Sequence, residues 1–357
     1  MADISLRKRI WGWFFFDWAS QPYHTVLITF IFGPFFAVVA AQYFAGQGFS
    51  DAEASTQAQS LWAWAMALFG IIIALFAPLF GAMADSTGRK LPWIIGFSAM
   101  YVLGSSALWF TYPDASNLYW MLALFGVGFI GAEWALIFIN AQLPGLGTRE
   151  EVGSISGKGF SFGYLGGVMC LAIALLLLVE QPNGKTLLPG MDPLFGLNAE
   201  QREGTRATGL LVALWFAVFM IPYFLWVREV RSDHQRPSVR AALRSVGASL
   251  SGLLSKPSLR NFLIGSMFYR DALNGLYTFG GIYAVGVLNW SVVQVGVFGV
   301  VAALGAAVLS YVGGFIDQRV GPRPVVLVTI WGLIAICFTV ISLTPTTIFG
   351  IACYWIA

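Results

Sequence analysis

"GAMADSTGRKLP" at residues 81–92 decides the fold, because "GGFIDQRVGPRP" at residues 313–324 repeats its plan. In each stretch a glycine stands four residues before an aspartate, and a second glycine, a basic residue and a proline follow. The first glycine allows another helix to approach, the acid can accept from a helix N-terminus or pair with a base, and the second glycine permits a tight reversal. The matching residues are Gly81, Asp85, Gly88, Arg89 and Lys90 in one copy and Gly313, Asp317, Gly321 and Arg323 in the other.

The chain around these loops is strongly apolar. Of its 357 residues 58% are hydrophobic and 10% are charged, whereas soluble domains carry about a quarter charged residues. Apolar runs of about 20 residues, enough for a helix to cross a hydrocarbon core of about 30 Å, recur throughout. The sequence therefore predicts an all-α polytopic membrane protein. The predicted spans are 11–41, 61–84, 92–111, 118–142, 154–180, 208–227, 260–287, 291–315, 324–343 and a last one from 347.

The basic residues orient these spans. With the N-terminus in the cytoplasm, sixteen of the 20 lysines and arginines fall on or near the cytoplasmic side, and only Lys185, Arg202 and Arg206 fall outside. This asymmetry predicts a cytoplasmic N-terminus. Both repeated loops then lie inside, where we expect Asp85 and Asp317 to lie at equivalent helix ends, each near a neighbouring helix N-terminus or an arginine.

A polar stretch divides the chain. Residues 1–227 hold six predicted spans, 228–259 form a linker, and 260–357 hold about four more. The last span stops after about eleven residues, which reach about half-way across the core, so the second half is expected to be incomplete.

In the linker, apolar residues at helical spacing lie opposite Arg236, Arg240 and Arg244. They favour a cytoplasmic helix along the membrane surface, with a solvated linker as the alternative.

The two loops place the same device after the second span of each half. This resembles the major facilitator superfamily, whose signature loop is of the type G-x-x-x-D-x-x-G-R-K and whose two six-helix halves pack around a central substrate path. The second copy departs from that pattern by one extra residue between the acid and the glycine and by a proline before the arginine. The resemblance implies the major facilitator fold, with an apparently truncated second half, and transport by rocking of the halves.

A narrower resemblance comes from three other stretches: "FFFDWASQPYHTVLITFIFGPFF" at 14–36, "NAQLPGL" at 140–146 and "GKGFSFGYLGGVM" at 157–169. They look like the bacterial relatives of the autophagy-related vacuolar effluxers, which are associated with amino-acid efflux. The resemblance implies a multi-pass protein of the bacterial inner membrane and favours amino acids as substrates. It leaves the substrate and the direction of transport open.

The first span carries polar residues on one face. Asp17, Gln21 and His24 stand at i, i+4 and i+7, and Pro22 lacks the backbone donor that would bind a carbonyl near Asp17 or Trp18. Such a broken, polar helix suits a substrate or ion path. The alternative is that Asp17 anchors the helix end at the headgroups, and that His24 bridges two helices.

A second acid lies deeper in the membrane. Glu133 follows the glycine-rich "GVGFIG" near the middle of the fourth span, and Asn140 stands seven residues later on the same face. An acid at this depth must keep its proton or find a base. Glu133 is therefore a candidate for the coupling proton site. A structural hydrogen bond between helices is the alternative.

The seventh span is the pseudo-equivalent of the first and carries Arg270, Asp271 and Asn274. We expect these side chains to meet Asp17 and Glu133 across a shared cavity, with a structural ion pair between the halves as the alternative. The glycines of the fifth span predict a close-packing surface.

The sequence thus predicts a secondary transporter of a small molecule, coupled to protons through Glu133 or Asp17. A uniporter, or a lipid-handling protein or sensor that transports nothing, is the alternative. A nucleotide-binding loop, a metal cluster and a nucleophile constellation are absent from the sequence, which predicts no enzyme activity and no cofactor. The expected partners are the substrate, the lipid bilayer and protons. A nucleic-acid partner is not expected, and the chain is expected to be a monomer.

Overall fold

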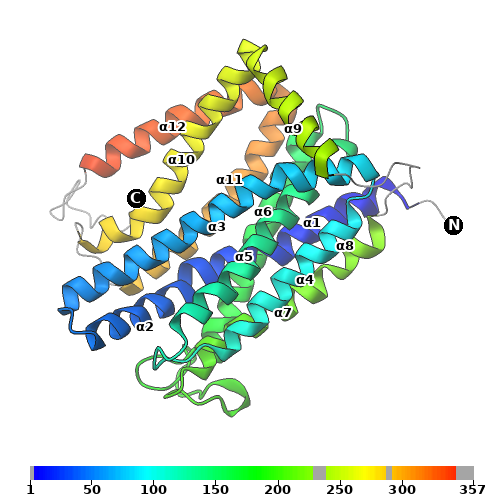
Figure 1. Cartoon of the computed structure of the whole chain (residues 1–357). Helices are drawn as coiled ribbons and strands as arrows, with labels where there is room; N and C mark the ends of the chain where they lie inside the picture. The colour runs from blue at the N-terminus through cyan, green and yellow to red at the C-terminus, as the bar shows by residue number, and fades with distance from the viewer. Residues whose placement is uncertain (1–3, 228–238, 287–291, 343–357) are drawn as a thin grey trace.

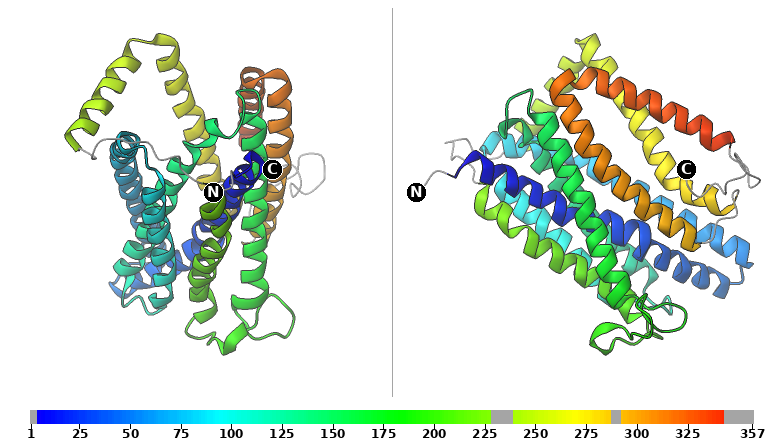
Figure 2. Two further views of the ribbon diagram at one scale, coloured as in Figure 1. Left: turned by 90° about the vertical axis from the view of Figure 1, so that its right-hand side faces the viewer. Right: turned by 180° about the vertical axis from the view of Figure 1, so that it is seen from behind.

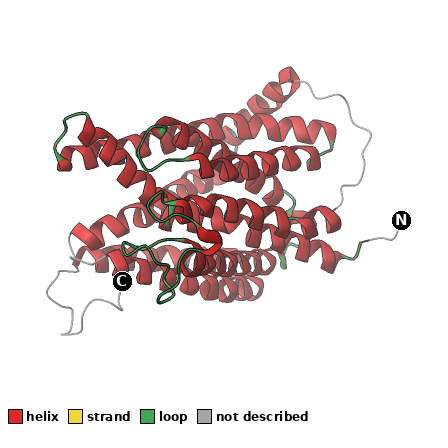
Figure 3. Ribbon diagram, turned by 90° about the horizontal axis from the view of Figure 1, so that it is seen from below, coloured by secondary structure: helices red, strands yellow, loops and turns green. Residues whose placement is uncertain are grey.

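The computed structural model describes residues 4–227, 239–286 and 292–342, and these form helices joined by loops, without a β-strand among them (Figures 1 and 3). Eight helical segments in this part of the chain are long and apolar enough to cross a membrane. The predicted all-helical membrane fold is confirmed. The segments are Leu6–Gly46, Asp51–Asp85, Leu91–Phe110, Leu118–Gly145, Val152–Leu178, Glu203–Trp226, Phe298–Val320 and Pro322–Val340.

The first span changes its helix type part-way. It runs as α1 (Leu6–Pro22), continues as a π-helix, η1 (Tyr23–Phe30), and resumes as α2 (Phe32–Gly46). Because Pro22 cannot donate to the carbonyl of Trp18, that carbonyl needs another partner. The indole N–H of Trp215 donates to it at 3.1 Å. The predicted break in the helix is present.

Five further helical runs complete the first half, and the second and third spans begin or end at residues that favour a helix terminus. Ser50 caps the second span through a reciprocal bond with Glu53, and Gly88 ends it with φ 63°. Pro92 stands in the first turn of the third span, where its missing N–H costs nothing. The elements are α3 (Asp51–Thr87), α4 (Leu91–Ala107), η2 (Leu108–Phe110), α5 (Leu118–Asn140), η3 (Leu143–Gly145), α6 (Val152–Ile173), η4 (Ala174–Leu178), η5 (Leu194–Gly196), α7 (Glu203–Phe219) and α8 (Ile221–Trp226).

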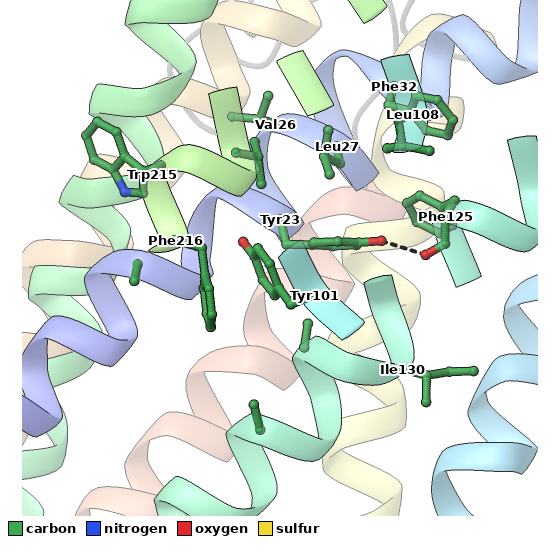
Figure 4. Packing of buried hydrophobic residues seen from close by; sticks show 14 of the residues in the cluster. Tyr23, Val26, Leu27, Phe32, Tyr101, Leu108, Phe125, Ile130, Trp215 and Phe216 are labelled. Atoms are coloured by element: carbon green, nitrogen blue, oxygen red, sulfur yellow. Dashed lines mark hydrogen bonds between the residues drawn. The ribbon is translucent and has the colours of Figure 1, made fainter. Parts of the chain in front are cut away.

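Aromatic side chains fill the centre of this half (Figure 4). Tyr23 is fully buried, and its hydroxyl donates to the carbonyl of Phe125 at 2.6 Å. Tyr101 stacks on Phe216 with ring centroids 3.9 Å apart. Buried hydroxyls need such acceptors, so Tyr23 fixes η1 against α5.

The second half follows the linker. α9 (Val239–Leu254) contacts α3 and leads into α10 (Pro257–Gly286), α11 (Val292–Val320) and α12 (Pro322–Ser342). α9 lies within residues 228–259, and a linker helix along the membrane surface stays a prediction. Arg236 and the tenth span, from residue 347, lie outside the described residues. Figures 1 and 2 show α10 and α12 at the edge of the bundle, away from α4 and α7.

α6 joins the two halves, as Figure 2 shows. One of its faces receives α1: a Cβ on Gly163 would lie 3.1 Å from the Cβ of Asp17, and one on Gly166 would lie 2.7 Å from the carbonyl oxygen of Trp18. Another face receives α11, where a Cβ on Gly157 would lie 2.8 Å from the Cα of Gly314. Real Cβ atoms essentially never approach other atoms to 2.7 or 2.8 Å, so the absence of a side chain at Gly166 and Gly157 permits both helix contacts.

Candidate functional site

The most prominent polar pair within the spans joins η1 to α5. His24 Nε2 lies 3.4 Å from Glu133 Oε1, and the two side chains are 37% and 24% exposed. Glycines of the "GVGFIG" run let the neighbours close in, because Gly128 faces the hydroxyl of Tyr23 and Gly131 faces the backbone of α4. The structure therefore places the imidazole of His24 beside Glu133, and the role of the pair stays a prediction.

The geometry of this pair follows from the broken first span. His24 is the second residue of the π-helix, and its carbonyl accepts from the hydroxyl of Thr29 at 2.9 Å. π-helical turns are rare and occur frequently at functional sites. The broken segment thus brings the imidazole of His24 against the carboxyl group of Glu133.

Asp17 occupies a different environment. It is 5% exposed and lies between Trp13 and the glycines of α6, where Gly159 and Gly163 leave room for it. Among the described residues its Oδ2 has no hydrogen-bond partner. Burial of this kind does not fit an acid that anchors a helix end at the headgroups. Asp17 is therefore an interior carboxyl on the contact between α1 and α6.

The other predicted polar residues of the first half are dispersed. Gln21 lies against Gly167 of α6, one turn beyond Asp17. Asn140 is the last residue of α5, about 10 Å along the helix from Glu133, so it does not share its depth. The freed carbonyl of Trp18 is used by Trp215 for helix packing. The polar face of the first span thus divides between α6 and α5.

Arg270, Asp271 and Asn274 do not meet this group, which corrects the expected contact across a cavity. All three side chains are exposed on α10, whose main described neighbours are α9 and α11. Arg270 forms no ion pair with a carboxylate of the described chain. The physical reason is the packing order: α11, and not α10, lies against α6 of the first half.

The turn glycines of the two repeated loops agree with the sequence analysis. Gly88 has φ 63° and Gly321 has φ 83°, and the left-handed region is open to glycine without a steric cost. The first glycines differ from expectation. A Cβ on Gly81 or Gly313 would meet no atom within 4 Å. In the second copy the close contact with α6 is made by the next residue, Gly314. Arg89 and Arg323 are exposed.

The two aspartates have different surroundings. Asp85 is 71% exposed and lies 3.6 Å from Lys90 of its own loop. The carboxylate of Asp317 lies directly against Gly153, the second residue of α6, where a Cβ would overlap its Oδ2. A negative charge there is favoured by the free N–H groups and the dipole of α6. Asp317 thus lies at the N-terminus of α6, whereas Asp85 lies beside Lys90, the residue that precedes α4.

Comparison with known proteins gives the same fold. A family model described as Major Facilitator Superfamily matches residues 25–357, which is most of the chain. The chain belongs to the Major Facilitator Superfamily. It is therefore a multi-pass membrane protein of a transporter superfamily. The match is to the superfamily as a whole, and the resemblance to vacuolar effluxers stays a prediction.

A relative within the superfamily comes from Bacillus subtilis (strain 168) and is named an uncharacterized MFS-type transporter, YxiO. The chain is 23% identical to it over 277 residues, which cover 76% of this chain and 59% of that protein. The chain thus spans about three fifths of the relative it matches. The inner membrane and the cytoplasmic N-terminus stay predictions.

The sequence analysis missed one polar cluster of this superfamily member. Glu180 is buried after the fifth span; it accepts from the backbone N–H of Thr205 at 3.1 Å, and Arg202 Nε lies 3.1 Å from its Oε1. The hydroxyl of Thr205 also donates to it. This carboxylate completes the N-terminus of α7. The sequence did carry a signal for this cluster. Glu180 ends the fifth predicted span and Arg202 precedes the sixth, so the acid and the base fall on the same side of the membrane and can pair.

Arg206 extends this cluster. It is 5% exposed, donates to the carbonyl of Trp109 at 2.9 and 2.7 Å, and lies 4.7 Å from the ring centre of Tyr112. The guanidinium thereby links α7 to the end of the third span. The cluster is a clamp at one end of the first half, at the opposite end from the repeated loops.

Proposed function

We propose that the protein is a secondary active transporter that moves a small solute by alternating access and is coupled to protons. The observation that carries this proposal is the His24–Glu133 pair, an acid and a base 3.4 Å apart and both partly exposed. Within a bilayer such a pair is costly unless it faces protein or water, and it is by default a functional candidate. The rocking units are residues 1–227 and 260–357, and the linker 228–259 connects them.

The pair suits an amino-acid substrate, which the resemblance to vacuolar effluxers also favours. An amino acid carries an ammonium, which can replace His24 beside Glu133, and a carboxylate, which can replace Glu133 beside His24. Asp17, about 10 Å along the helix from His24 and on the contact with α6, is the second candidate acid.

The test uses the full-length protein in proteoliposomes with labelled amino acids and an imposed pH gradient. Glu133→Gln is expected to lose the response to the gradient and to keep exchange, because the coupling proton has lost its site. His24→Gln should show the same defect, and the double variant should be no worse, since the two residues act as a unit. Asp17→Asn tests the other acid.

The matched control is Glu150→Gln, which removes a carboxylate of the same size from an exposed loop residue. It should leave the pH response unchanged. Amino-acid flux that ignores the gradient in the unaltered protein would replace this proposal by a uniporter. A complete lack of flux for every labelled solute would favour a lipid-handling protein or a sensor on the same scaffold.

A further inference from the structure

A groove of about 440 Å³ opens beside the beginning of the first span, outside the residues of the proposed transport path. It is formed by the start of α1 and the end of α8, and its volume falls within the usual range of ligand-binding clefts, about 300–1,000 Å³. The residues that line it are Ser5, Arg7, Lys8, Trp11, Phe15 and Trp226.

The groove has two chemically distinct parts. Its floor is aromatic: Phe15 lies between Trp11 and Trp226, with ring centroids 6.4 and 6.2 Å apart. Its rim is cationic, because Arg7 and Lys8 are exposed and form no ion pair with a described residue. Ser5 adds a hydroxyl at the same rim.

The position of the groove matches a membrane surface. Arg7 and Lys8 stand in the first turn of the spanning segment Leu6–Gly46, where cations reach the headgroups, and Trp11 follows one turn deeper. Tryptophan prefers the boundary between headgroups and hydrocarbon. The cations thus lie at the depth of a phospholipid's phosphate, and the aromatic floor lies at the depth of its first methylene groups.

From this arrangement we propose that the groove is a binding site for one anionic phospholipid. The phosphate lies between Arg7 and Lys8, and the start of an acyl chain lies on Trp11, Phe15 and Trp226. Free phosphate would use the rim alone and would leave the aromatic floor without a ligand. A zwitterionic lipid would place its own cation near two others, so charge complementarity selects an anionic headgroup. The site does not depend on the proposed transport function.

The test measures lipid binding to the full-length protein by native mass spectrometry. The probes are phosphatidylglycerol and phosphatidylcholine with identical acyl chains. Because each cation near the surface contributes about a five-fold change in affinity, Arg7→Gln/Lys8→Gln should weaken phosphatidylglycerol binding about thirty-fold. Phosphatidylcholine binding should stay the same. Both residues are exposed, and an unchanged thermal unfolding midpoint checks that the variant folds.

One control variant and one further test variant separate the groove from general surface charge. Arg240→Gln/Arg244→Gln removes the same charge from exposed positions of α9, outside the groove, and should leave the affinity near its original value. Trp11→Ala should weaken phosphatidylglycerol binding without changing the rim. An equal loss in the α9 control, an unchanged affinity in the rim variant, or displacement of the lipid by millimolar inorganic phosphate would overturn the proposal.

A photoreactive phosphatidylglycerol locates the site directly. With the reactive group near the headgroup, cross-links should concentrate in the peptide that contains residues 5–11, and they should be lost in the rim variant. Cross-links confined to other helices would contradict the assignment, whatever the measured affinities.

Discussion

Asp85 and Asp317 stand at the same point of the two repeated loops, yet their side chains have different partners. Asp85 is 71% exposed and pairs with Lys90 of its own loop, whereas Asp317 lies against Gly153 at the start of α6. The loop motif therefore supplies an acid at a helix end and a turn behind it. Whether this acid contacts the other half of the protein depends on which helix packs beside it. Beside Asp317 that helix is α6, because the glycines of α6 let α11 approach closely.

The largest expected effect comes from filling the contact beside Asp317. Gly157→Leu would drive a side chain into the backbone of α11, where a Cβ alone would lie 2.8 Å from the Cα of Gly314. Overpacking against backbone costs about 3 kcal/mol. We expect a lower thermal unfolding midpoint, and a longer distance between spin labels at Lys158 and Gln318.

Gly81→Leu is the matched control for this substitution, because a Cβ there meets no atom within 4 Å. It should leave both the unfolding midpoint and the label distance nearly unchanged. If the two leucine variants behaved alike, the glycines of α6 would not be the reason why the second loop engages.

A smaller effect is expected where the two loops are alike. Gly88 and Gly321 both have positive φ, so Gly88→Ala and Gly321→Ala should each destabilise the protein by about 1 to 2 kcal/mol. Thermal unfolding in detergent measures this. Gly313→Ala, in a helix with open space around it, should be neutral or slightly stabilising. A large difference between the two turn variants would mean that the loops do not share their turn geometry.

The smallest expected effect tests the charges themselves. Asp317→Asn removes the charge that faces the N-terminus of α6, a loss of about 1 kcal/mol, which shifts a two-state equilibrium about five-fold. Asp85→Asn breaks an exposed pair and should cost about 0.5 kcal/mol or less. The populations of short and long distances between labels at Lys158 and Gln318 report both. A larger shift for Asp85→Asn would reverse the comparison.

Much of the helical fold could be predicted because it depends on local properties. The third span was predicted at 92–111 and lies at Leu91–Phe110. The ends of the second span were less accurate: 61–84 was predicted, and the helix runs from Asp51 to Thr87. Hydropathy identifies only the apolar part of a helix, the part that lies in the lipid. The capping bond of Ser50 with Glu53 extends this helix beyond that part, into polar surroundings.

The site was predictable residue by residue but not pair by pair. Pro22 indicated that a carbonyl near Trp18 is free, but nothing local identifies Trp215, nearly 200 residues away, as its partner. Glu133 was expected to keep its proton or to find a base, and Arg270 was expected to meet either Glu133 or Asp17. His24 occupies that place instead, because helical periodicity fixes the face of a residue and does not fix the helix that this face meets.

The two glycine faces of α6 have a consequence for how this protein can evolve. A helix that packs against one neighbour keeps its remaining faces open to change, but α6 carries α1 on one side and α11 on another. Any gain of volume at Gly157 or Gly163 must be matched by a loss on a different helix. The positions of α6 that can change size without such a compensation are its exposed ones, Lys158, Phe160, Leu165, Met169 and Ala172.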